Sequence, residues 1–337
     1  MNTRYVVGLD NGATANKFTV MDASGHYLID ELVEVPSHVT GGPGAALGAL
    51  RETFDVALQM AGIRRDQVVG VGLDSPGPAT ADGVISARGG TNFGHPGWSG
   101  FDFRTSLERI LELPVVYTND ANAAALYAHH RHFGAVAAER SSVSAIVGTG
   151  LGGGVIETGR VVSGAAGMAG ELGHIHIPMD GLLIDDQPTP RCNCGFIGDA
   201  ESVASLTGIC NNLLPYWLTR YPDHPLHGVA ALDAAKQVRG YGERGDEMAL
   251  QIFEQQAMAI GRLFTIAANF IDPHVYFVGG GVIEAAEHFR TWFLDRVRTH
   301  TWLREEQFDI AEIREVTDLD MAGCRGAAVA ALSALGH

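Results

Sequence analysis

The chain has 337 residues, 46% of them hydrophobic and 18% charged, which is long enough for two domains and a sizeable core. Its 23 Lys and Arg against 39 Asp and Glu give a net charge of −16, which argues against nucleic acid as a main partner because duplex binding needs clustered cations. No apolar run reaches the ~18 residues of a membrane span, and four cysteines do not make a secreted disulfide framework, so we expect a cytoplasmic protein.

The N-terminal residues predict a hairpin that binds phosphate. A short apolar strand over 6–10 ends at Asp10, and a second strand follows over 18–21. Between them, Gly12 leaves the backbone open to a phosphate and Thr14 can donate a hydrogen bond. The carboxylate that ends the first strand can hold a hydrated Mg²⁺ at the phosphates.

The next segment predicts a strand over 27–35, a helix over 44–61 with apolar residues three and four apart, and a buried strand over 68–74. The Ser-Pro-Gly-Pro run at 75–78 is as consistent with a plain strand-terminating turn as with a ligand-lining loop. By residue type alone, Asn92 fits an ordinary loop position.

A group of polar residues marks the junction between a predicted strand over 115–117 and a predicted helix over 121–129. Asp120 there is either a general base or a helix N-cap, for which Asn and Asp are preferred. Asn119, Asp120 and Asn122 place three polar groups at one helix terminus, where capping needs one. This surplus favours a catalytic role.

A second glycine hairpin follows over 145–156, with Thr149 and Gly150 at its turn. Its strand–turn–strand order fits neither a Rossmann fingerprint nor a Walker loop, and alone it also fits a tight turn. A third glycine turn, containing Gly280, follows a predicted strand over 275–278. Three strand-terminal glycine turns in one chain favour phosphate or nucleotide binding.

Between these hairpins lie an acid, a histidine and a cysteine pair. Glu171 and His174 are three residues apart, so both can point into one pocket. Cys192 and Cys194 are one residue apart, so two thiolates can reach a single ion. By residue type alone, Glu201 fits a carboxylate in the first turn of a helix, where the helix dipole favours a negative charge.

The C-terminal part is predicted to be mainly helical, with a partly extended stretch over 308–316. Helices are expected over 204–218, 232–239, 246–270, 286–298 and from 321 onward.

These motifs, in this order, resemble the ROK family of bacterial sugar kinases, within the actin, hexokinase and Hsp70 superfamily. The resemblance runs from Gly8 to Ala328 and implies an α/β, two-lobed, actin-like ATPase (ribonuclease H-like) fold with a cleft between the lobes. It implies a small lobe of 1–118 plus about 321–337, and a larger lobe of 119–320. The matching motifs are Asp10-x-Gly12-x-Thr14, Asn119-Asp120-x-Asn122, Gly148-Thr149-Gly150, Glu171-Leu172-Gly173-His174 and Cys192-x-Cys194-Gly195.

The resemblance implies an ATP-dependent kinase that converts glucose to glucose 6-phosphate, with Asp120 as general base and a homodimer or homotetramer as the assembly. The sugar ligands it implies are Asn92, Asn119, Glu171, His174 and Glu201. The residues that it places around Mg·ATP are Asp10, Gly12, Thr14, Thr149, Gly150 and Gly280.

The resemblance also implies a structural zinc ion. Members of the family offer three cysteines and a histidine, but Asp199 stands here at the third cysteine position. Carboxylate is a legitimate zinc ligand, so the predicted ligands are His174, Cys192, Cys194 and Asp199. Fewer soft ligands weaken the preference for zinc.

Three departures or alternatives stay open at this point. A longer loop over 94–97 leaves the acceptor open among glucose, N-acetylmannosamine, N-acetylglucosamine, allose and fructose, and an extended loop over 178–191, between the histidine and the cysteines, is a further departure with no role assigned. Asn11 and Ala13 depart from the family's Asp-x-Gly-Gly-Thr pattern, which leaves polyphosphate open as the donor. A sugar-sensing regulator is the alternative of another class, although the sequence shows no helix-turn-helix and retains Asp120.

Overall fold

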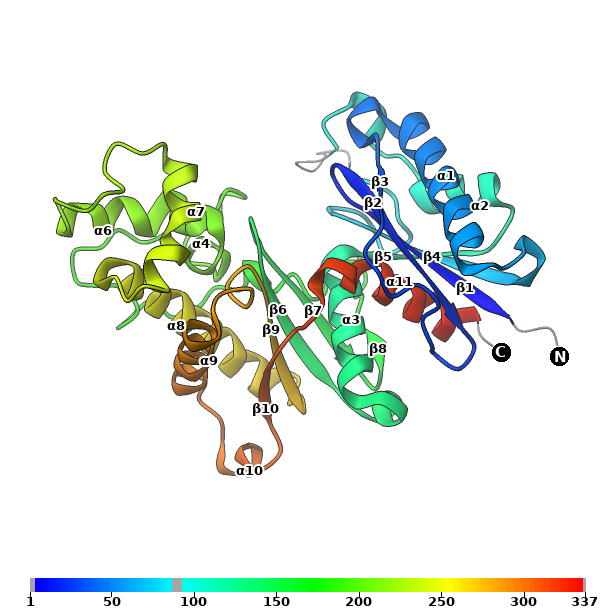
Figure 1. Cartoon of the computed structure of the whole chain (residues 1–337). Coiled ribbons are helices and arrows are strands. Elements are labelled where there is room, and N and C mark those ends of the chain that lie inside the picture. Colours follow the sequence, from blue (N-terminus) through cyan, green and yellow to red (C-terminus); the bar gives the residue numbers. More distant parts are fainter. Residues whose placement is uncertain (1–3, 87–92, 336–337) are drawn as a thin grey trace. The chain divides into compact units, whose positions relative to one another are not determined.

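The computed structural model describes residues 4–86 and 93–335, so Asn92 lies outside the described residues. By its internal contacts the chain forms two compact units, each built on its own sheet (Figure 1). The first unit comprises Met1–Ala138, Gly159–Ala169 and Asp318–His337, and the second comprises Glu139–Thr158 and Gly170–Thr317. Among the described residues, no helix is both long and apolar enough to span a bilayer.

The first unit contains a five-stranded sheet in the order β3-β2-β1-β4-β5. Strands β1, β4 and β5 are parallel, and β2 is antiparallel to both β1 and β3, so the carboxyl ends of three neighbouring strands meet at one edge. The strands are β1 (Tyr5–Asn11), β2 (Ala15–Asp22), β3 (Glu34–Pro36), β4 (Val68–Ser75) and β5 (Val115–Asn119).

The strand expected over 27–35 is wrong in length, because only Glu34–Pro36 lies beside β2 as a strand. The residues before it, 30–32, are exposed and lack a strand partner in the described chain. The helical segments of this unit are η1 (Val39–Gly41), α1 (Pro43–Ala61), η2 (Arg65–Gln67), η3 (Pro96–Trp98), α2 (Phe103–Leu111), α3 (Asp120–Phe133), η4 (Gly134–Glu139), which runs one residue into the second unit, and α11 (Leu319–Leu335).

The apolar faces of α1 and α2 pack on this sheet and enclose a core of buried aliphatic and aromatic side chains. Trp98 is fully buried there, and its ring lies edge-on to those of Phe93, Phe101 and Phe103.

Helix α11 lies directly on the backbone of β1 and β4. Gly8 and Gly72 are paired in the register of these strands. A Cβ on Gly8 would lie 1.9 Å from the Cys324 carbonyl oxygen, and one on Gly72 would lie 1.9 Å from that of Ala327. Glycine is therefore required at both positions, because any side chain would displace the helix.

The second unit contains β9 between β10 and β6, with β7 antiparallel to β6. These strands are β6 (Ser142–Val147), β7 (Leu151–Glu157), β9 (Val275–Gly280) and β10 (Glu312–Glu315); the two-residue β8 (Arg160–Val161) follows β7 in the chain. The helical segments are η5 (Leu172–His174), α4 (Glu201–Ala204), α5 (Leu206–Gly208), the π-helix η6 (Ile209–Leu213), α6 (Leu214–Arg220), α7 (Ala231–Gly242), α8 (Glu247–Phe270), α9 (Glu287–His300) and α10 (Glu305–Phe308).

Two boundaries differ from the expectations. The single helix expected over 204–218 is broken at Ser205, which has extended backbone and whose hydroxyl accepts a hydrogen bond from the Gly208 N–H. Helix α3 belongs to the first unit because it packs on α11, whereas we expected residue 119 to begin the second lobe.

Candidate active site and metal centre

Three carboxylates lie at the carboxyl-terminal edge of the first unit's sheet. Asp10 and Asp74 face each other across β1 and β4, and Asp120 follows β5. Burial, with the nearby charge of Asp120, raises the pKa of Asp10 to about 6, although Lys17 opposes the shift. Burial and the charge of Asp10 raise the pKa of Asp74 well above its usual range. The carboxyl ends of parallel strands are where α/β folds bind their ligands.

Asp120 is the first residue of α3, and its place there is not needed for capping. Asn119 is the N-cap residue, and its side chain accepts the Ala121 N–H at 3.0 Å. The Asp120 carboxylate accepts the same N–H at 2.8 Å. The side chain has solvent-accessible atoms, yet desolvation by the protein around it raises its pKa, and the hydrogen bonds only partly oppose this. Such a carboxylate is a stronger base than an ordinary aspartate.

The first hairpin turns tightly at Gly12, whose N–H donates to the Ala15 carbonyl oxygen at 3.0 Å. Thr14 is exposed at this turn. Asn11 is fully buried, and its amide donates to the Asn16 side chain at 2.6 Å, away from the exposed turn. Asn11 therefore packs and hydrogen-bonds inside the unit.

The second hairpin, between β6 and β7, is held by the segment that follows the cysteines. Thr149 is exposed, and its carbonyl oxygen accepts hydrogen bonds from the N–H and the hydroxyl of Thr207 at 3.1 and 2.9 Å. The Glu201 carboxylate accepts the Leu151 N–H at 2.9 Å. A Cβ on Gly150 would lie 2.6 Å from that carboxylate, so a side chain there would displace the Glu201 carboxylate from the hairpin.

The third glycine turn lies on the same sheet. Gly280 has a φ of +94°, and a Cβ there would lie 1.9 Å from the Val147 carbonyl oxygen of β6. The next residue, Gly281, donates its N–H to that oxygen at 3.0 Å. Thr149 and Gly280 therefore lie at neighbouring strand ends of the second unit.

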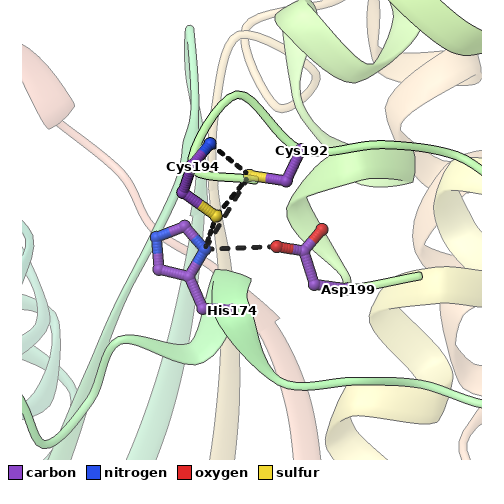
Figure 2. A group of neighbouring side chains, drawn as sticks. All are labelled: His174, Cys192, Cys194 and Asp199. Atoms are coloured by element: carbon purple, nitrogen blue, oxygen red, sulfur yellow. Dashed lines mark hydrogen bonds and ion pairs between the residues drawn. The ribbon is translucent and has the colours of Figure 1, made fainter. Parts of the chain in front are cut away.

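The structure brings the four predicted metal ligands together, and Figure 2 shows their side chains converging. One ligand atom from each of His174, Cys192, Cys194 and Asp199 lies within 4.8 Å of the others. The His174 Nδ1 is 3.2 Å from the Asp199 Oδ2 and 3.6 Å from the Cys194 Sγ, and the two sulfur atoms are 3.2 Å apart. Zinc bonds of about 2.0–2.3 Å put tetrahedral ligands about 3.3–3.8 Å apart, so the spacing fits one small ion.

The surroundings of this cluster orient its ligands. Asp199 is fully buried, and its other oxygen accepts the Ser202 N–H at 2.9 Å, so one oxygen stays directed at His174. Burial raises the pKa of the Cys192 thiol, which donates to Glu201 at 3.2 Å. A bound cation would favour the thiolate instead.

The profile of the ROK family matches residues 6–334. The chain belongs to the ROK family.

Similar proteins include sugar kinases with two different acceptor sugars in their names. A glucokinase of Halalkalibacterium halodurans is 31% identical over 312 residues, covering 88% of each chain. An N-acetyl-D-glucosamine kinase of Pectobacterium atrosepticum is 29% identical and covers 96% of this chain and 97% of its own. The crystal structure of a ROK family glucokinase from Streptomyces griseus, in complex with glucose and AMPPNP, is 27% identical with a TM-score of 0.68, covering 96% of this chain and 98% of that one. The predicted actin-like ATPase fold is confirmed.

The predicted site residues of this ROK chain divide between its units. The first unit holds Asp10, Gly12, Thr14, Asn119 and Asp120, and the second holds Thr149, Gly150, Glu171, His174, Glu201 and Gly280.

Two findings were not foreseen. His176 stands in an apolar run, where a histidine is usually a core residue, but it is exposed with its ring beside Phe196. Asp74 was taken only as the last residue of a strand, and its partner Asp10 becomes visible only once the strand register is known.

Proposed function

We propose that this ROK protein is an ATP-dependent hexose kinase with glucose as its first acceptor to test. The main support is the position of Asp120, whose carboxylate has a raised pKa and lies at the same sheet edge as Asp10. Because Asn119 already caps helix α3, Asp120 is not needed as a cap. The family and its glucokinase relatives support the choice of reaction.

In this mechanism Asp120 removes the proton from the C6 hydroxyl of the sugar as that oxygen attacks the γ-phosphate. Phosphoryl transfer needs mainly positioning and charge neutralisation. The exposed turns at Gly12 and Thr149 offer backbone N–H groups and hydroxyls for the donor's phosphates. Mg²⁺ would be held by Asp10 and would neutralise phosphate charge.

Sugar recognition is assigned to Asn92, Asn119, Glu171, His174 and Glu201. A pocket that hydrogen-bonds a hydroxyl rejects a sugar without it, because buried polar groups would stay unpaired. The Glu201 carboxylate also accepts the Leu151 N–H, so this proposed sugar ligand is bonded directly to the second hairpin. Zinc at the Cys-His-Asp cluster, a homodimer or homotetramer and a cytoplasmic location complete the proposal.

Two alternatives receive unequal support. An acceptor with an N-acetyl group is favoured by the N-acetyl-D-glucosamine kinase relative. Polyphosphate as donor loses the support of Asn11, whose side chain is buried in the first unit, and keeps that of Ala13, which is exposed at the turn.

The proposal is tested by incubating the purified chain with Mg·ATP and a panel of hexoses and measuring ADP in a coupled assay. We expect turnover with glucose, and the rates for N-acetylglucosamine, N-acetylmannosamine, allose and fructose then rank the acceptors. Polyphosphate in place of ATP tests the donor. Absence of turnover with every hexose and either donor would refute the proposed function, and an operator-binding assay would then test the regulator.

A further inference from the structure

Asp74 has no part in the mechanism above, although its surroundings are unusual. It is fully buried at the end of β4, and neither of its carboxylate oxygens accepts a hydrogen bond from a nitrogen or hydroxyl group of a described residue; its polar neighbour is the Asp10 carboxyl, with which it can share a proton. An ionised carboxylate buried without a donor or a cation is strongly unfavourable. Its position therefore calls for a proton or a cation beside it.

The group that Asp74 faces is a second carboxylate. Asp10 is its partner in the parallel register of β1 and β4. A Cβ on Gly323 of α11 would lie 2.9 Å from the Asp10 Oδ2 and 3.2 Å from the Asp74 Oδ2, so both oxygens lie beside the same point on that helix. Two ionised carboxylates this close repel each other unless a cation or a proton lies between them.

The charged side chains around the pair do not neutralise it. The nearby cation is Lys17, opposite Asp10 on β2, and its ammonium also lies 4.0 Å from the Asp320 carboxylate. Asp120 adds a further negative charge to both members of the pair. Among the residues that the structure describes, Asp10, Asp74 and Asp120 therefore share the single cationic side chain of Lys17 at this edge.

The chemistry of this edge fits Mg²⁺. This ion binds proteins through one or two carboxylates together with the phosphates of a substrate. Asp10 is partly exposed, so an ion can reach the pair from solvent.

We propose that Asp74 and Asp10 together form a divalent-cation site, in which the Asp74 carboxylate is a ligand of the Mg²⁺ that accompanies the phosphoryl donor. The inference rests on the proposed function, since the donor's phosphates supply the remaining ligands. From the sequence, Asp10 alone is predicted to bind Mg²⁺, and the pairing of β1 with β4 places Asp74 beside it.

Mn²⁺ serves as the probe, because its free concentration can be measured by electron paramagnetic resonance. The full-length chain is stripped with EDTA and titrated with Mn²⁺, with and without AMPPNP. We expect Asp74→Asn and Asp74→Ser to weaken Mn²⁺ binding by at least about tenfold. Asp55→Asn, which changes an exposed carboxylate on α1, should leave the affinity unchanged.

Thermal unfolding of the same metal-free proteins shows whether the variants fold, and the Mn²⁺-dependent rise in Tm should be smaller for the Asp74 variants. Equal Mn²⁺ affinity in wild type and Asp74→Asn would overturn the site, as would a wild type that binds no Mn²⁺ under either condition. The hexose assay separates the two proposals. Mn²⁺ bound through Asp74 without turnover of any hexose refutes only the function, and turnover with unchanged Mn²⁺ affinity refutes only the site.

Discussion

Replacing Asp10 by asparagine should stabilise the metal-free protein while impairing catalysis. Burial raises the pKa of Asp10 from 3.8 to about 6 in the folded chain. Between these values the folded state binds more protons than the unfolded state, so the free energy of unfolding falls as pH rises through this window. Raising this pKa from 3.8 to about 6 lowers the free energy of unfolding by about 3 kcal/mol at pH 7.5, and about half of that loss is already present at pH 5.

Asp10→Asn removes this penalty, and its amide can donate to Asp74. In EDTA at pH 7.5 we expect the variant to be more stable than wild type by up to about 3 kcal/mol, with a smaller difference at pH 5. Urea unfolding followed by circular dichroism and tryptophan fluorescence measures both values, and coincident transitions check the two-state assumption. Asp55→Asn is the control and should change stability by less than about 0.5 kcal/mol. A variant less stable than wild type at pH 7.5 would show that the charge of Asp10 does not destabilise the metal-free fold.

Three further predictions concern the fold and the second unit. Gly72→Ala should lower the free energy of unfolding in urea by about 1–3 kcal/mol or more, because its Cβ would lie 1.9 Å from the Ala327 carbonyl oxygen. Gly48→Ala, on an exposed turn of α1 with open space around it, should raise that free energy by up to about 1 kcal/mol. Equal effects of the two substitutions would contradict the packing argument. Elemental analysis should find about one zinc per chain in wild type and much less in Asp199→Ala, and unchanged zinc in the variant would remove Asp199 from the site. Glu201→Ala should raise KM for ATP as well as for glucose if its bond to the second hairpin matters, and a change in the glucose value alone would leave it a sugar ligand only.

The sequence predicts the features whose information is local. The Cys192 and Cys194 spacing, with His174 and Asp199, leads to four ligand atoms that the structure brings together. Each hairpin follows from a strand with a glycine just after its last residue. The N-terminal residue of α3 also follows, because the polar run around Asp120 marks where a strand ends and a helix begins.

Features that depend on pairing between distant segments could not be predicted. The Asp10 and Asp74 pair depends on the register of β1 and β4, which a one-residue shift would abolish. Strand β3 is short because only residues 34–36 pair with β2 as a continuous strand, while Tyr27 forms an isolated bridge to Met21 of β2, although the residues between them alternate like a strand. The need for glycine at Gly72 appears only once α11, more than two hundred residues later, lies on it.

The kinetics of Asp120→Asn test directly whether Asp120 is the general base. With wild type, Asp55→Asn and Asp120→Asn assayed side by side with glucose and Mg·ATP, we expect only Asp120→Asn to lose kcat, by about 10²–10⁴-fold. Glucose affinity, measured by calorimetry, should stay close to that of wild type in all three proteins. An Asp120→Asn variant with wild-type turnover would contradict the assignment of Asp120 as the general base.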